Sequence, residues 1–235
     1  MRQISNRTTK TAQERVHEIL DVSQALFVQK GYEATSVQET IDAVGIAKGT
    51  FYHYFRSKSD LLDAVVERIV EQTVAVIHTV VDNSQLDALA KFRQIFVRSN
   101  SWKLQHQDLL IELLRVMYRP ENAILRDRVR SMSMEVAGPL LAKVIRQGVE
   151  EGVFHTEDPE EVALIVLHMG QAVSDTIAHV LLSAQRDEEV ARRVGRRARA
   201  YERSIERVLG ASPGSLDLRL QEMFAQWLAR PKADL

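Results

Sequence analysis

The stretch that decides the fold runs from Thr35 to Asp60 and reads TSVQETIDAVGIAKGTFYHYFRSKSD. It predicts a short helix beginning at Ser36, a tight turn at Gly45, and a second short helix over 48–55. Ser36 and Glu39 have the spacing of a capping box, which satisfies the unpaired N–H groups at a helix start. Gly45 suits the turn because glycine tolerates a left-handed backbone. This order of elements predicts a helix-turn-helix.

The second short helix divides into two faces. Phe51 and Phe55 are four residues apart, so both point inward. The remaining side chains point elsewhere, and Gly49 has no side chain to hold the backbone away from a surface. A small, donor-rich helix start with aromatic side chains suits contact with phosphates and base edges. The sequence therefore predicts that this helix enters a DNA major groove.

The net charge of the whole chain does not reveal the basic charge of this region. The 235 residues hold 31 Lys and Arg against 32 Asp and Glu, a net charge of −1, which by itself argues against a nucleic-acid partner. Segment 43–59, however, contains only basic charges, and the first residues of the chain are also basic. These basic residues are Arg2, Arg7, Lys10, Arg15, Lys48, Arg56 and Lys58.

The rest of the chain predicts an all-α protein. Ten Gly and five Pro are few for this length, which disfavours a many-turned β fold. Apolar residues at helical spacing predict about nine or ten helices in all. We expect a DNA-binding domain over 1–56 and a larger helical domain over 57–235, with a kink or break at Gly138-Pro139. Outside the helix-turn-helix, helices are predicted over 11–30, 57–81, 86–103, 107–118, 121–151, 159–184, 187–209 and 215–229.

The N-terminal segment resembles the TetR family of bacterial transcriptional regulators. The matching residues are Phe27, Gly31-Tyr32, Thr35-Ser36-Val37, Gly45-Ile46, Lys48 to Phe55, Ser57-Lys58 and Leu61-Leu62. The resemblance implies base-edge or groove contact at Lys48, Gly49, Thr50 and His53. It implies phosphate contact at Thr35, Ser36, Tyr52, Tyr54 and Lys58, although Tyr54 could instead pack within the domain. Three positions depart from the common pattern, namely Thr40, Val44 and Ala47, and the last removes a helix cap.

The resemblance further implies a homodimer that binds a two-fold DNA operator, and a C-terminal domain that binds a small effector. We therefore expect a ligand-responsive repressor in the cytoplasm. The alternative is a helical small-molecule binding or carrier protein without DNA activity, which leaves segment 35–58 unexplained. No enzyme motif is present, and we expect no cofactor, metal or membrane partner, since the chain has no Cys and no long apolar run.

Candidate effector residues come from two groups. On 159–184, His168, Gln171, Asp175 and His179 fall within about 80° of one another on the helix. This polar stripe either lines a pocket, or makes contacts within the chain or across a dimer. Met and aromatic residues on the central helices either form a ligand cage or pack in the core. The candidates are Trp102, His106, Tyr118, Met134, His168, Gln171 and Asp175.

The segment 187–207 is rich in arginine, which could indicate a second nucleic-acid surface. It also carries glutamates spaced to pair with the arginines at i and i+4, namely Glu188 with Arg192 and Glu189 with Arg193. We interpret this segment as a solvated, salt-bridged helix.

Overall fold

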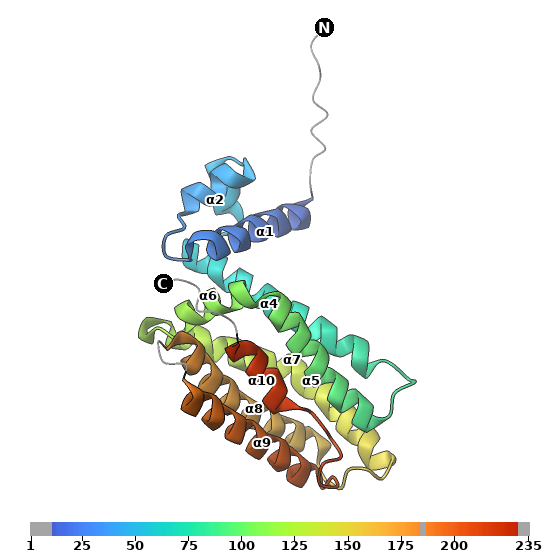
Figure 1. Ribbon diagram of the computed structural model, residues 1–235. Coiled ribbons are helices and arrows are strands. Elements are labelled where there is room, and N and C mark those ends of the chain that lie inside the picture. The colour runs from blue at the N-terminus through green and yellow to red at the C-terminus, as the bar shows by residue number, and fades with distance from the viewer. Residues whose placement is uncertain (1–10, 184–186, 230–235) are drawn as a thin grey trace. The chain divides into compact units, whose positions relative to one another are not determined.

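The computed structural model describes residues 11–183 and 187–229. These residues form ten α-helices and one short 3-10 helix, and none of them lies in a strand (Figure 1). The prediction of an all-α fold with nine or ten helices is therefore confirmed. The chain divides into two compact units, Met1–Arg68 and Ile69–Leu235, which are described separately.

The first unit contains helices α1 (Ala12–Lys30), α2 (Val37–Val44), α3 (Lys48–Tyr54) and the start of α4 (Lys58–Val81). The caps predicted from the sequence are confirmed. Thr11 and Glu14 form a capping box on α1, and Ser36 and Glu39 form another on α2. Gly45 ends α2 in the left-handed conformation, with φ 71° and ψ 38°, so the turn requires its conformational freedom.

A small apolar core holds these helices together. Phe27 of α1 and Phe51 of α3 are almost fully buried, and Phe51 lies 5.7 Å from Phe55 between ring centres. Burial of large apolar side chains is the main favourable term in folding. The other fully buried members come from α1 and α4 and include Ile19, Leu61, Leu62 and Val65.

The boundary between the units differs from the one we expected. The sequence placed it after residue 56, at the end of the helix-turn-helix, whereas the structure divides the chain after Arg68, inside α4. The difference arises because the first turns of α4 complete the small core. Leu61 and Val65 are buried, and Arg68 donates a hydrogen bond to Asp21 of α1.

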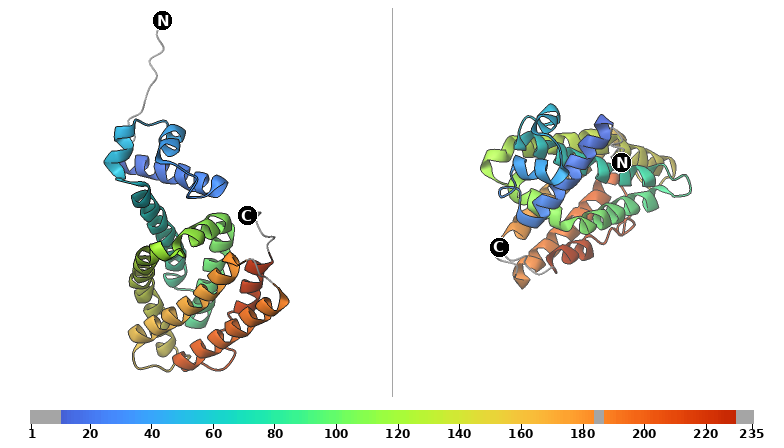
Figure 2. Two further views of the ribbon diagram at one scale, coloured as in Figure 1. Left: turned by 90° about the vertical axis from the view of Figure 1, so that its left-hand side faces the viewer. Right: turned by 90° about the horizontal axis from the view of Figure 1, so that it is seen from above.

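The second unit is a bundle built from the rest of α4 and six further α-helices. Helix α7 packs against α5 and α8, and α9 packs against α8 and α10 (Figures 1 and 2). The remaining elements are α5 (Ala88–Gln105), α6 (Gln107–Met117), η1 (Pro120–Asn122), α7 (Ala123–Glu150), α8 (Pro159–Leu182), α9 (Glu188–Leu209) and α10 (Leu220–Leu228).

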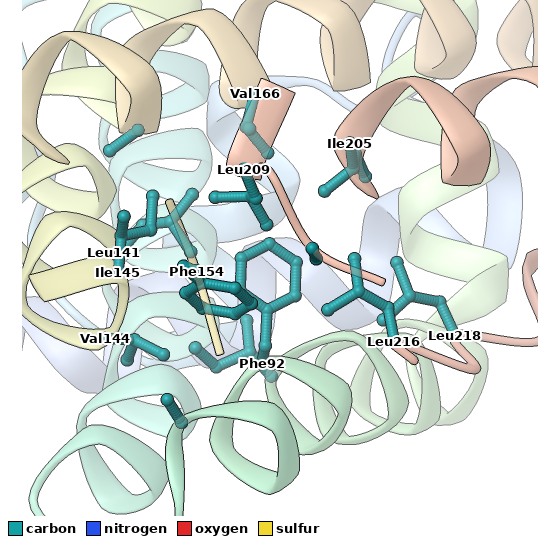
Figure 3. Close-up of a cluster of buried hydrophobic side chains, with 14 of the residues drawn as sticks. Phe92, Leu141, Val144, Ile145, Phe154, Val166, Ile205, Leu209, Leu216 and Leu218 are labelled. Atoms are coloured by element: carbon teal, nitrogen blue, oxygen red, sulfur yellow. The ribbon is translucent and has the colours of Figure 1, made fainter. Parts of the chain in front are cut away.

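The core of this unit centres on two aromatic rings. Phe92 of α5 and Phe154, just after α7, meet edge to face at 6.0 Å between ring centres (Figure 3). Both are almost fully buried, as are Ile145 of α7 and Leu209 at the end of α9. Edge-to-face packing suits the charge distribution of aromatic rings.

Two predictions about helix bounds need correction. Helix α7 is continuous through Gly138-Pro139, so the break that the sequence allowed there is absent, while a kink stays a prediction. Gly138 is buried, and a Cβ there would lie 3.2 Å from Leu164 of α8, so close packing between the two helices supports the chain where Pro139 removes a hydrogen bond.

Helix α10 begins at Leu220, not at 215. The residues before it form an irregular segment in which Asp217 and Arg219 have positive φ values of 44° and 51°. This segment buries Leu216 and Leu218, whose N–H groups donate to the carboxylates of α9. Burial of these two leucines is therefore incompatible with an earlier helix start.

Helix α8 is long and apolar enough to cross a membrane by length and composition alone, with 28% of its most apolar window buried. One such helix is weak evidence for a membrane segment, because the core helices of soluble proteins also meet this criterion. In the structure α8 packs against both α7 and α9. Its outer face stays exposed, including Ile165, which is 46% exposed, and Ala172.

Candidate nucleic-acid interface and effector region

Helix α3 is held at its C-terminal end and left open at its start. Phe51 is fully buried, and its carbonyl accepts the N–H of Phe55 at 2.9 Å. At the other end Ala47 occupies the N-cap with an extended backbone, and no side chain caps the helix. The missing cap expected from the sequence is confirmed. Backbone N–H groups at such a start favour negatively charged partners.

The outward face of α3 carries the residues predicted to contact DNA. Lys48, Gly49, Tyr52 and His53 are all exposed, and the Lys48 ammonium lies 5.9 Å from the centre of the Tyr52 ring. Thr50 is half-buried beside them. One accessible surface of α3 therefore presents a cation, a phenol, an imidazole and the uncovered backbone at Gly49.

Gly49 has no structural reason to be glycine. Its backbone is not in the left-handed region, and a Cβ at this position would meet nothing within 4 Å. Glycine inside a helix costs about 0.5–1 kcal/mol relative to alanine. A requirement imposed from outside the chain, such as close approach of another molecule, would account for this residue.

Four residues with predicted phosphate contacts also have roles within the unit. Thr35 is buried, and its hydroxyl donates to the Gly31 carbonyl at 2.8 Å. Ser36 caps α2. Lys58 donates to a backbone carbonyl at 3.0 Å and lies 4.2 Å from the Tyr32 ring centre. Tyr54 is half-buried, with its ring edge-on to His53.

Phosphate contact by these four residues stays a prediction, and Tyr52 is the most accessible member of the predicted phosphate set. The basic residues predicted to contribute from the start of the chain, Arg2, Arg7 and Lys10, lie outside the described residues.

In the second unit, three of the predicted effector residues meet at one carboxylate. Asp175 Oδ1 on α8 accepts hydrogen bonds from the Tyr118 hydroxyl at 2.6 Å, from Arg130 at 2.5 Å and from Gln171 at 2.9 Å. These donors come from the end of α6, from α7 and from α8 itself. The sequence analysis missed Arg130. Its place one helical turn before Met134 is the signal that could have identified it.

The surroundings shift the pKa values of both Asp175 and Tyr118. Burial alone would raise the pKa of Asp175, but the hydrogen bonds from Tyr118 and Gln171 and the Arg130 charge outweigh it, so the pKa is lowered. Burial, together with the hydrogen bond to Asp175, raises the pKa of Tyr118 to about 12. Asp175 is therefore ionised and Tyr118 is neutral near pH 7.

The remaining effector candidates occupy other places. The Trp102 ring stacks on the His106 ring near the end of α5, with centres 4.2 Å apart. Met134 is half-buried on α7, and His168 is exposed with Nδ1 2.7 Å from the Leu164 carbonyl. His179 lies edge-on to Tyr118, with ring centres 5.2 Å apart. The polar stripe therefore splits, with Gln171 and Asp175 bonded inside the unit and both histidines exposed.

The arginine-rich helix α9 forms ion pairs, as predicted, with one change of partner. Glu188 pairs with Arg192 at 2.7 Å. Glu189 pairs with Arg192 and Arg196 instead of Arg193, at 3.0 Å and 3.2 Å. Within the described part of the chain, no group of three or more His, Asp or Glu residues is placed to hold a metal ion.

Comparison with known proteins agrees with this geometry. Residues 19–65 match the family described as bacterial regulatory proteins, tetR family. The repressor KstR2 of Mycobacterium tuberculosis is 27% identical over 144 residues, which cover 60% of this chain and 69% of that protein. A TetR-family regulator from Pectobacterium atrosepticum has a similar fold, with TM-score 0.61, 18% identity, and coverage of 85% of this chain and 98% of that one.

A transcriptional regulator from Cytophaga hutchinsonii likewise matches 91% of this chain and 96% of its own, with TM-score 0.59 and 19% identity. The fold and the exposed helix α3 define a DNA-binding protein of the helix-turn-helix class. The helix-turn-helix segment of this chain, residues 19–65, matches the TetR family of bacterial transcriptional regulators, whose members are DNA-binding proteins and not enzymes.

Proposed function

We propose that this regulator is a cytoplasmic homodimeric repressor that binds a two-fold operator and is released by a small-molecule effector. The observation that carries the DNA-binding part is the exposed, uncapped start of α3, with Lys48, Gly49 and Tyr52 on one accessible surface. In each half-site the start of α3 enters the major groove. Lys48, Gly49, Thr50 and His53 approach the base edges, while Tyr52 contacts a phosphate.

The exposed face of α8 supports the proposed homodimer. This helix has the most apolar composition in the second unit, yet Ile165 is 46% exposed and Ala172 is also exposed. Ile165 and Ala172 are seven residues apart and therefore share one face of α8, and exposed apolar side chains on a shared face favour contact with a partner. Two copies of α8 packed face to face would cover this surface in an isologous interface.

The Asp175 cluster supports an effector site at the junction of α6, α7 and α8. It offers a cation, a carboxylate, an amide and a phenol that together could orient a small molecule. Trp102, His106, Met134 and His168, which lie outside this cluster, stay proposed effector residues. An effector releases DNA only if it binds the conformation that does not fit the operator more tightly.

The experiment is a mobility-shift titration with DNA selected by the protein from random sequence, with Lys48→Ala compared against Lys143→Ala. Both changes remove one exposed lysine, but Lys143 lies on α7. We expect the first to weaken binding by about 1–3 kcal/mol and the second to have little effect. Tyr52→Phe should also weaken binding, and sedimentation should give a dimer for every variant.

Equal affinity of the Lys48 variant and the wild type would contradict the assignment of α3. A protein that selects no DNA at all would favour the carrier alternative. Release of bound DNA by one member of a metabolite panel would identify the effector.

A further inference from the structure

We infer that Arg68 is a positioning residue. Its hydrogen bonds fix the orientation of α4 on α1, and the dimer therefore binds tightly only to operators whose two half-sites have one particular spacing. This inference rests on the proposed function, because it concerns how the two DNA-binding units reach one operator. It adds a residue that neither the exposed α3 surface nor the effector region includes.

The Arg68 guanidinium reaches three positions on α1. It donates to Asp21 Oδ1 at 2.7 Å, to the His17 carbonyl at 3.4 Å, and to Gln24 Oε1. The side chain of Arg68 is only 12% exposed, although Asp21 is 72% exposed. The acceptors occur at i, i+4 and i+7, so they follow one face of α1 over two turns.

Simple packing does not explain this arginine. Arg68 Nε and Gln24 Nε2 are both buried without a hydrogen-bond partner. The guanidinium loses most of its contact with water while Asp21 stays exposed, so the ion pair adds little net stability. The guanidinium instead fixes the orientation of α4 on α1, because its planar set of donors holds several acceptors in one geometry.

The fixed geometry of these hydrogen bonds matters because Arg68 lies where α4 leaves the first unit. Arg68 is the last residue of the first unit, while α4 continues without interruption to Val81 in the second. At the start of α4 Lys58 donates to the Glu33 carbonyl, and the buried α4 side chains of the small core, such as Leu61 and Val65, are apolar. Apolar burial is non-directional, so these contacts permit rotation that the Arg68 hydrogen bonds oppose.

The consequence concerns operators of different length. A dimer gains affinity from its second DNA-binding unit only when both units fit their half-sites at once. A unit held rigidly on α4 fits one spacing, whereas a unit that swings on α4 tolerates several. We call the hydrogen bonds from Arg68 to His17, Asp21 and Gln24 the Arg68 clamp. Its loss should reduce the difference in affinity between operators of correct and altered spacing more than it reduces affinity for the correct operator.

The test measures affinity for the selected operator and for derivatives with a single base pair inserted or removed between the half-sites. Arg68→Met keeps the length of the side chain and removes the planar set of donors. We expect the ratio of affinities between correct and altered spacing to fall by threefold or more. Lys48→Ala is the control, because it should weaken binding to every spacing and leave the ratio unchanged.

Two further variants keep the test decisive. Arg68→Lys retains a cation for Asp21, and should restore part of the ratio. Asp21→Asn changes an exposed residue, so the fold should tolerate it, and it should lower the ratio in the same direction as Arg68→Met. Adding Arg68→Met to Asp21→Asn should then have a smaller effect than it has alone.

An equal loss of affinity on all spacings for both clamp variants would overturn the inference, since it would make the clamp a stabilising contact only. An unchanged ratio would overturn it as well. Failure of the wild type to bind any DNA is a different result, because it removes the proposed function itself.

Discussion

The hydroxyl of Tyr118 donates a hydrogen bond of 2.6 Å to Oδ1 of Asp175, which joins the C-terminal end of α6 to α8. The same oxygen accepts a hydrogen bond from Arg130 of α7. One carboxylate therefore ties three helices of the second unit together. Because the helices meet through ionised and hydrogen-bonded groups, their attachment should depend on pH.

The pKa of Asp175 is lowered in the folded protein, so this group contributes stability above its unfolded pKa of about 3.9 and loses it as pH falls through the folded value. Asp175→Asn should therefore reduce the free energy of unfolding by about 1–3 kcal/mol at pH 7. The difference from wild type should shrink below about pH 4. Urea unfolding across this range measures both effects.

Glu135→Gln is the matched control for this experiment, because Glu135 is exposed on α7. It should change the free energy of unfolding little at any pH. A pH-independent difference between wild type and Asp175→Asn would contradict the assignment.

Gly49→Ala should separate stability from DNA binding. A Cβ at Gly49 meets nothing within 4 Å, so alanine should stabilise the protein by about 0.5–1 kcal/mol. If the backbone of α3 approaches DNA closely at this point, the same change should weaken operator binding. Thermal unfolding and mobility shift measure the two effects. A variant that gains stability and binds DNA with unchanged affinity would argue against close approach at Gly49.

Ala47→Ser should supply the cap that α3 lacks. Ala47 has φ −70° and ψ 147°, the extended conformation of an N-cap, and no side chain bonds the helix start. A serine hydroxyl there should stabilise the first unit by about 1 kcal/mol. Ala43→Ser, at an exposed position inside α2, is the control and should not stabilise. Denaturant unfolding distinguishes them, and equal effects would indicate that the start of α3 already has its N–H groups satisfied.

Gly148→Ala should damage the core of the second unit. A Cβ at Gly148 would lie 2.0 Å from the Phe154 ring, which is almost fully buried among the residues in Figure 3. Overpacking of this kind costs about 1–3 kcal/mol. Gly195→Ala is the control, because its Cβ would meet Gln221 at an ordinary 3.5 Å. Similar unfolding midpoints for the two variants would show that Phe154 moves freely.

The local features of the fold could be predicted because each depends on residues close in sequence. The capping boxes at Thr11 and Ser36, the left-handed turn at Gly45 and the absent cap at Ala47 are all set within a few residues. Features that depend on packing could not be predicted in this way. Helix α10 starts late because Leu216 and Leu218 are buried against α9, a contact that no local pattern reveals.

The sequence by itself determined the helical class, the helix-turn-helix and the exposed residues of α3, because periodicity and capping act over single turns of helix. Only the tertiary structure decided which distant side chains meet. It joined Arg130 to Asp175, left the two histidines of the polar stripe exposed, and brought the Arg68 guanidinium of α4 into contact with α1. Such contacts follow from the way whole helices pack, which no short stretch of sequence specifies.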